Sequence, residues 1–179
     1  MKSRLIIAAI SVGGLLSTAA CEHGYLGTKS KEIAVDAKLT ITEDGAGGFD
    51  FKYDAPFADA EGNFDFSKGE PYGKFVRLSF TISDDSGLGL KFKPDGREAI
   101  WIVDKKNVGS DGSPEGPFRG TQFRDFEVSA DGKTLSLLDQ NDDGVLYRYG
   151  LRFDMGSQTV VDDPDLNNGQ GGGHTGGGN

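Results

Sequence analysis

The residues best suited to chemistry form a short acidic run, DQNDDG, at positions 139–144. Asp139, Asn141 and Asp143 stand at alternate positions with a glycine directly after them, as at the start of an EF-hand calcium loop. The twelfth position of such a loop carries a bidentate Glu, but here it is Gly150. The run also fits a polar hairpin turn, because Asp and Asn bond to nearby backbone and glycine accepts positive φ.

The turn explains every residue of the run without a ligand, so we predict a turn and no cofactor. The alternative is a weak Ca²⁺ site, with a dissociation constant of ~10⁻⁴–10⁻³ M as in extracellular modules. Strand-like segments flank the run in place of the EF-hand helices. The calcium alternative therefore needs further oxygen ligands, and the acidic candidates are Asp131, Asp142 and the segment 162–165.

Catalytic groups are scarce elsewhere in the chain. The two histidines, His23 and His174, lie near the two ends, and the only cysteine is Cys21. Nucleophilic triads and Cys/His zinc sites therefore lack their side chains in the middle of the sequence. No phosphate-binding glycine motif follows a strand pattern. A carboxylate hydrolase of the glycosidase kind is the enzyme class that remains, but plentiful carboxylates single out no pair, so we predict no catalytic activity.

The N-terminus predicts export. Lys2 and Arg4 precede an apolar stretch at 5–16 and small residues at 17–20. Charge, apolar core and small-residue exit in this order are typical of a secretory signal peptide, and the apolar core is too short to span a bilayer. We therefore assign residues 1–20 to a signal peptide.

The segment LLSTAAC, residues 15–21, resembles the bacterial lipobox. The resemblance implies cleavage directly before Cys21 and a diacylglycerol on its sulfur, which would also explain an unpaired cysteine in an exported chain. The alternative is ordinary cleavage near Ala20, which leaves a free cysteine. Glu22 in place of Asp resembles the sorting signal for the outer membrane in a Gram-negative source.

Charge and composition describe the mature chain. Loss of the leader leaves 17 basic and 28 acidic residues, a net charge of −11, which repels phosphate backbones and makes nucleic acid an unsuitable partner. The polar segment 21–31 is typical of a tether. Residues 167–179 have seven glycines and no apolar residue, so we predict a disordered Gly-rich tail. One domain, residues 32–166, remains.

Within this domain, apolar residues recur with a period of two. Such alternation indicates strands with one face on a core, and glycine-containing turns separate the segments. The segment 99–103 is apolar on both faces and predicts a central strand. The pattern as a whole predicts an all-β, antiparallel, immunoglobulin-like β-sandwich of eight to nine strands. The expected strands cover residues 33–41, 49–53, 76–82, 88–92, 99–103, 126–128, 135–137, 145–153 and 159–161.

Two longer segments, 55–73 and 105–122, are the predicted main loops. Loops on a rigid scaffold are where binding residues concentrate, so their aromatic side chains are candidates for contact with an envelope protein or a glycan. Two of these aromatic residues, at 64 and 66, also fit a small strand or a packed plug. The candidates are Phe57, Phe64, Phe66, Tyr72 and Phe118.

Three segments in the C-terminal half resemble a family of small bacterial β-sandwich proteins, the DP-EP group. They are WIVDKKN at 101–107, FEVSADGKTLSLLDQNDDGVLYRYGLRF at 126–153 and DDPDLNN at 162–168. Asp163, Pro164 and Asn167 match the Asp-Pro ending of that family, and Trp101 with Asp104 match an earlier motif. The resemblance implies a fold and no established activity. We interpret Asp163-Pro164 as a strand terminator, since proline cannot donate to a ladder.

Taken together, these patterns predict a lipid-anchored protein of the bacterial cell envelope that acts as a non-catalytic binding or structural module. Its membrane contact would be the lipid on Cys21, in the outer membrane and facing the periplasm if the source is Gram-negative. The alternatives are an envelope protein stabilised by calcium at residues 139–144 and, less favoured, a carboxylate-based hydrolase.

Overall fold

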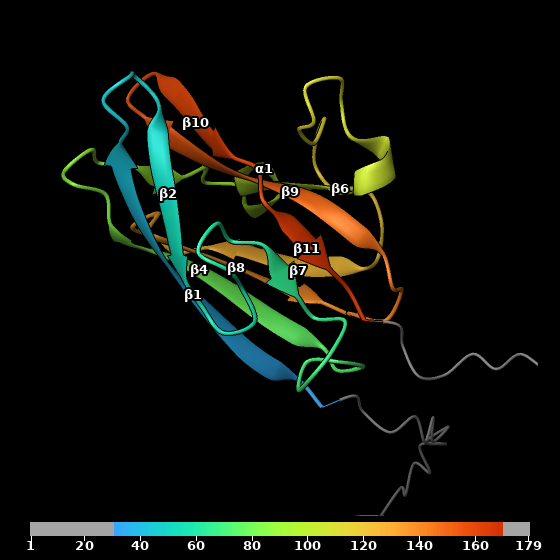
Figure 1. Ribbon diagram of the computed structural model, residues 1–179. Helices are drawn as coiled ribbons and strands as arrows, with labels where there is room; N and C mark the ends of the chain where they lie inside the picture. The colour runs from blue at the N-terminus through green and yellow to red at the C-terminus, as the bar shows by residue number, and fades with distance from the viewer. Residues whose placement is uncertain (1–30, 170–179) are drawn as a thin grey trace, which may run out of the picture.

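The computed structural model describes residues 31–169, which form a sandwich-like arrangement of two β-sheets (Figure 1). The described residues contain one short helix, α1 (Gly96–Ala99), and a 3₁₀ turn at Lys105–Asn107. Their strands are β1 (Ile33–Glu43), β2 (Phe49–Asp54), β3 (Phe64–Asp65), β4 (Val76–Asp84), β5 (Lys91–Phe92), β6 (Ile100–Asp104), β7 (Phe123–Val128), β8 (Thr134–Asp139), β9 (Leu146–Met155), β10 (Gln158–Asp162) and β11 (Asp165–Asn167). The expectations for Cys21, the 1–20 leader, residues 21–30 and residues 170–179 lie outside the described residues.

The first sheet has the strand order β2-β1-β4-β8-β7. Its central strands show the alternation expected from the sequence, since β1 buries every second residue. Val35, Leu39 and Ile41 have no exposed surface and point toward the second sheet, while Asp36 and Lys38 face solvent. Each apolar side chain of this kind stabilises the fold by ~1.5–3 kcal/mol through burial.

The second sheet is built around β9, a strand of 10 residues with one apolar face. On one side β9 pairs with β10 and then β11, and on the other side it pairs with β5 and then β6. The short strand β3 extends the sheet beyond β11. Tyr149, Leu151 and Phe153 point inward from β9, and Gly150 and Arg152 therefore lie on the outer face.

The core lies between the two sheets and is rich in aromatic side chains. Phe80 of the first sheet and Tyr149 of the second have ring centroids 5.7 Å apart, and Phe64 packs edge-on against Phe80 at 6.0 Å. Phe51 and Phe153 stack on each other between the sheets, with ring centroids 5.7 Å apart. The two layers are thus joined by rings, whose size gives them a large share of the buried apolar surface.

Two features of the predicted sandwich are wrong. The sheets are mixed, because β1 runs parallel to β4, and β3 runs parallel to β11. Period-two alternation reports which face is buried but carries no information on strand direction. The segment 99–103 is also not central: among the described residues β6 pairs with β9 alone, and its outward-facing Trp101 is half-buried under loop residues.

The C-terminal end of the domain differs from the expected boundary. Asp163-Pro164 ends β10, as proline should, but β11 follows at once along the same edge of β9. The Pro164 carbonyl still accepts from the Tyr149 N–H at 2.9 Å, so the edge continues across the interruption. Asn167 lies in β11, and Asn168 and Gly169 are buried. Packed structure therefore extends three residues past 166.

Candidate functional site

The DQNDDG run begins at the last residue of β8, and Asp139 is completely buried there. Its Oδ1 accepts three hydrogen bonds, from the Asn141 N–H at 2.8 Å, Gln122 Nε2 at 2.9 Å and Asn168 Nδ2 at 3.1 Å. Three segments far apart in the sequence therefore meet at one carboxylate oxygen. We call the residues Gln122, Asp139, Asn141, Asp143 and Asn168 the Asp139 cluster.

The carboxylate of Asp139 is held in an unfavourable environment for a negative charge. Burial raises the pKa of Asp139 to about 7, and the nearby charge of Asp143 adds to this, while the three donated hydrogen bonds act against it. Its Oδ2 is buried without a hydrogen-bond partner among the described residues, as is Oδ1 of Asn168. The ion pairs seen in residues 31–169 do not include Asp139.

Asn141 is turned away from the position that a calcium loop requires. Its Nδ2 donates to the Pro71 carbonyl at 2.8 Å, and its Oδ1 accepts from the Gly169 N–H at 2.6 Å. Its backbone adopts a left-handed φ of 49°, which Asn tolerates better than most residues. The side chain thus connects the 55–73 loop to the chain end and does not join Asp139 around a common point.

Asp143 lies at the exposed side of the cluster. It accepts from the Val145 N–H at 3.1 Å and from the Tyr147 hydroxyl at 2.5 Å, while Asn168 Nδ2 lies 3.4 Å from its Oδ1. Across residues 31–169 there is no group of three or more His, Cys, Asp or Glu side chains placed to hold a metal ion. The predicted hairpin turn is wrong, because β8 and β9 belong to different sheets and do not pair. The run is instead a hydrogen-bonded connection between the two sheets, and it fixes the end of the described chain.

Sequence reasoning missed two members of the cluster, Gln122 and Asn168. Of these, Asn168 lies in a segment that was predicted to be disordered. Composition assigned Asn168 to the glycine-rich tail, although it stands two residues after Leu166, the last apolar residue of the chain. The asparagine pair after Leu166 in DDPDLNN was the available signal. Asn and Gln side chains can donate and accept at once, which suits them to a buried polar junction.

The aromatic candidates of the two long loops divide into core and surface residues. Phe64 and Phe66 are buried in the core, so the expectation that they are exposed contacts is wrong, whereas the small strand or plug is confirmed by β3. Phe118 packs edge-on against Phe123, with ring centroids 4.9 Å apart. Phe57 and Tyr72 are exposed, at 37% and 47%. The five aromatic residues therefore do not form one surface.

A cleft of about 350 Å³ lies on the outer face of the second sheet, beneath the 105–122 loop. We call it the Trp101 cleft. Its floor is a row of outward-facing positions on β6, β9 and β10, and its roof comes from the 111–114 turn, where Asp111 and Pro114 also line it. The residues that define it are Trp101, Ser113, Gly150, Arg152, Val161 and Asp163.

The floor of the Trp101 cleft is set by strand register. Trp101 of β6 is the cross-strand partner of Gly150, so the two lie on the same face. From the other side of β9, Asp163 approaches the same glycine: a Cβ added at Gly150 would lie 2.6 Å from Asp163 Oδ1. Only glycine leaves room for this approach, and Trp101 and Asp163 therefore flank one residue without a side chain.

The indole ring of Trp101 is held by a cation. The Arg152 guanidinium lies over it, 3.7 Å from the ring centroid, and the same Arg152 pairs with Glu98 at 3.0 Å. Such a cation–π contact stabilises by ~0.5–2 kcal/mol, depending on how far it is removed from water. The Trp101 Nε1–H and Asp163 Oδ1 are both buried and have no hydrogen-bond partner among the described residues.

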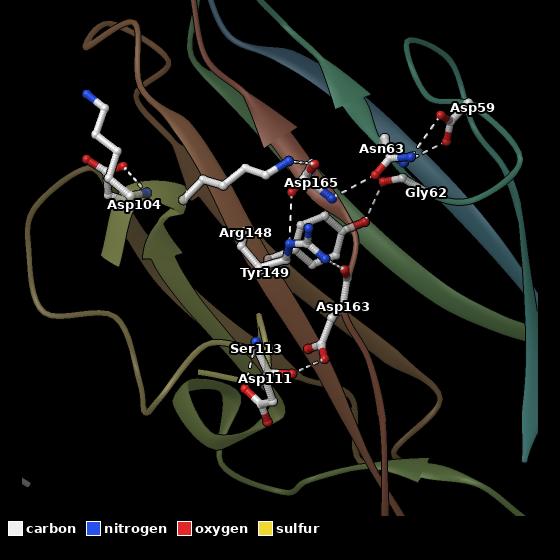
Figure 2. A network of polar contacts seen from close by, with 12 residues as sticks. Asp59, Gly62, Asn63, Asp104, Asp111, Ser113, Arg148, Tyr149, Asp163 and Asp165 are labelled. Carbon is white, nitrogen blue, oxygen red and sulfur yellow. Dashed lines mark hydrogen bonds and ion pairs between the residues drawn. The ribbon is translucent and has the colours of Figure 1, made fainter. Parts of the chain in front are cut away.

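Asp163 is positioned by a polar network that Figure 2 shows from close by. Its Oδ2 accepts from the Ser113 hydroxyl at 2.6 Å, and its backbone carbonyl accepts from Arg148 at 2.7 Å. Arg148 in turn pairs with Asp165 at 2.9 Å, and Lys105 pairs with Asp165 at 2.5 Å. These contacts fix the chain between β10 and β11 at both Asp163 and Asp165. They also hold the Asp163 carboxylate over Gly150.

The chain matches no model of a known protein family, and a search of curated proteins found no similar sequence. Within residues 31–169, no helix has the length and apolar character needed to cross a membrane.

Proposed function

We propose that this protein is a non-catalytic binding module of the bacterial cell envelope, held at a membrane by a lipid on Cys21. We also propose that its sandwich is immunoglobulin-like and related to the DP-EP group. In a Gram-negative source the anchor would lie in the outer membrane, with the domain in the periplasm. The lipobox at 15–21 and the domain that follows a short polar segment support the anchor.

The observation that carries the binding role is the position of the Trp101 cleft. In Figure 1 the described chain begins at the bottom, in blue, while the yellow-green 105–122 loop projects at the upper right. A tether attached at residue 31 therefore holds the opposite end of the domain from this loop. Sites on loops of a rigid scaffold, directed away from the anchor, suit the capture of a partner.

The hydrolase alternative has one observation in its favour, since Asp111 and Asp163 both line the cleft. Both carboxylates, however, contact the same residue: Asp111 accepts from the Ser113 N–H at 3.0 Å and Asp163 from its hydroxyl. Glycoside hydrolysis needs one carboxyl group to protonate the leaving oxygen while a second acts from the other side of the bond. Because Asp111 and Asp163 both bond to Ser113 and hold the same turn, they are not placed on opposite sides of a substrate bond. Their arrangement therefore favours binding over hydrolysis.

Membrane fractionation tests the proposed function. The full chain and its Cys21→Ser variant are expressed with the leader in a bacterial host that is fed labelled palmitate. We expect the natural chain in the membrane fraction with the label, and the variant in the soluble fraction without it. Equal distribution of the two chains, or a label that survives Cys21→Ser, would contradict the anchor.

A further inference from the structure

We propose that the Trp101 cleft binds a neutral, hydroxyl-rich ligand, a glycan, through the Trp101 N–H and the Asp163 carboxylate. The inference rests on the proposed function, because it names the ligand class of that binding site. It is carried by four observations: a donor and an acceptor left without partners, a glycine that lets the acceptor reach the floor, a fixed indole ring and the charges around it.

The first observation is the pair of unpartnered atoms. Trp101 Nε1 and Asp163 Oδ1 are a donor and an acceptor that lie in one cleft, and neither has a hydrogen-bond partner in residues 31–169. Buried polar groups are nearly always paired, so each calls for a partner. A hydroxyl-rich ligand suits both groups, because its hydroxyls can accept from the N–H and donate to the carboxylate.

The second observation is the space above Gly150. Trp101 is the cross-strand partner of Gly150, and the missing side chain lets Asp163 Oδ1 come to 2.6 Å from where a Cβ would stand. A volume of about 350 Å³ is at the small end of ligand sites, which span ~300–1,000 Å³. The cleft therefore fits the end of a glycan better than a long stretch of chain.

The third observation is the fixed orientation of the indole. Arg152 covers the Trp101 ring, and Glu98 holds Arg152 through an ion pair at 3.0 Å. The ring is thus positioned before any ligand arrives, and its N–H edge is left as the group that recognises the ligand. Preorganised donors of this kind reduce the ordering cost of binding.

The fourth observation is the charge of the lining, which selects against ions. Asp111 and Asp163 are acidic, and the one cation, Arg152, is already paired with Glu98. An anionic ligand would be repelled by the carboxylates, while a cation would meet the positive edge of the indole N–H. A neutral molecule with hydroxyl groups can bond to the carboxylates and to the indole N–H without a repelling charge.

Access to the cleft depends on the 111–114 turn. Ser113 holds this turn over the floor through its hydrogen bond to Asp163, and Pro114 approaches to within 3.6 Å of the Gly150 Cβ position. A ligand that reaches Trp101 Nε1 must lift the turn. Ser113→Ala removes the hydrogen bond that holds the turn closed, so this variant should bind the oligosaccharide faster than the natural chain does.

The test uses Trp101 itself as the probe, because it is the only tryptophan in the chain. The full chain, purified in detergent, is titrated with maltohexaose, chitohexaose, cellohexaose and mannohexaose while tryptophan emission is recorded. We expect a saturable change in emission with at least one oligosaccharide, without release of shorter sugars. Release of shorter sugars would contradict binding without hydrolysis.

Two variants remove the site in different ways, and one serves as a matched control. Gly150→Ala fills the space beside Asp163, and Asp163→Asn keeps the shape but replaces an acceptor. Each variant should weaken oligosaccharide binding at least tenfold. If Gly150→Ala fails to fold, the affinity of a folded Asp163→Asn variant tests the site alone. Tyr72→Ala, which removes an exposed aromatic residue outside the cleft, should bind as the natural chain does.

No saturable change with any of the four sugars up to about 10 mM, where a millimolar site is nearly filled, would overturn the inference and leave bridging water as the occupant. Binding that survives Asp163→Asn would also overturn it. The titration does not depend on the membrane. A chain that is lipidated but binds no sugar refutes this inference alone, while a chain that binds sugar without a lipid refutes the anchor alone.

Discussion

Asn168 donates its side-chain N–H to Oδ1 of Asp139 over 3.1 Å, and so ties the end of the described chain to the end of β8. The backbone N–H of Asn168 also donates to Val145 at 3.0 Å, which places it beside the start of β9. One residue therefore joins both sheets at the same corner of the domain. The DQNDDG run is best understood as the partner of this residue.

The pKa of Asp139 predicts a loss of stability as pH rises. Its folded pKa of about 7 lies above its ordinary value of 3.8, so the folded state holds a proton that the unfolded chain releases. The free energy of unfolding should fall between about pH 4 and pH 7 by up to ~4 kcal/mol, and then level off. Asp162, with a pKa raised to about 6 by burial, adds a smaller change of the same sign.

Asp139→Asn isolates this effect. Asn keeps an acceptor for the three N–H groups but carries no charge, so the variant should match or exceed the natural chain in stability at pH 8. Urea unfolding of the full chain at pH 5 and pH 8 measures the difference, with Asp143→Asn as a control for loss of an exposed charge nearby. An unchanged pH dependence in Asp139→Asn would mean that this carboxylate does not hold the proton.

Two truncations test the chain end. Deletion of residues 168–179 removes the Asn168 and Gly169 contacts and leaves Asp139, Asn141 and the Gly144 N–H each short of a partner. We expect a loss of about 2–4 kcal/mol, since an unsatisfied buried polar group costs ~1–3 kcal/mol. Deletion of residues 170–179 keeps all of these bonds and should leave the unfolding free energy unchanged. Similar stability of both truncated chains would show that the boundary at 166 is correct.

Calcium should leave the melting temperature of the full chain unchanged at millimolar concentration. The reason is the engagement of Asn141, whose side chain bonds to Pro71 and Gly169 and so does not reach an ion beside Asp139. Differential scanning calorimetry with and without Ca²⁺ measures this, and Mg²⁺ controls for ionic strength. A saturable rise in melting temperature that disappears in Asp143→Asn would instead establish the calcium-stabilised alternative.

Phe66 and Tyr72 come from the same long loop but should differ in their effect on stability. Phe66 is fully buried beside Phe64, so Phe66→Ala should cost about 3–5 kcal/mol. Tyr72 is 47% exposed, and Tyr72→Ala should change the free energy of unfolding by no more than about 0.5 kcal/mol. Chemical denaturation of both variants decides between core and surface roles, and a small effect for Phe66→Ala would place this residue outside the core.

The alternation of β1 and β9 was enough to predict which side chains of these strands face the core, because pleating couples sequence parity to one face. It could not predict the parallel pairing of β1 with β4. That pairing depends on the 55–73 segment, whose β3 joins the second sheet through β11. Strand direction is decided by contacts between residues far apart in the sequence.

The candidate site shows the same limit. Local Asp and Asn chemistry predicted the backbone hydrogen bonds that Asp139 and Asp143 accept within the 139–144 run. It did not predict that the run crosses from one sheet to the other, or that Asn168 is its partner. Trp101 appeared to be a core residue because Ile100, Ile102 and Val103 surround it, yet strand register places it on the outer face opposite Gly150. The Trp101 cleft comes from four separate segments, and no local pattern links Trp101 to Asp163.

The central claim is that this domain is held at a membrane through Cys21 and presents the Trp101 cleft away from it. The most direct test is mass spectrometry of the N-terminal peptide from the mature protein, purified from a bacterial host. We expect a peptide that begins at Cys21 and carries the mass of a diacylglycerol, with or without a further acyl chain. An unmodified peptide that begins at Cys21, or a mature chain that begins elsewhere, would contradict it.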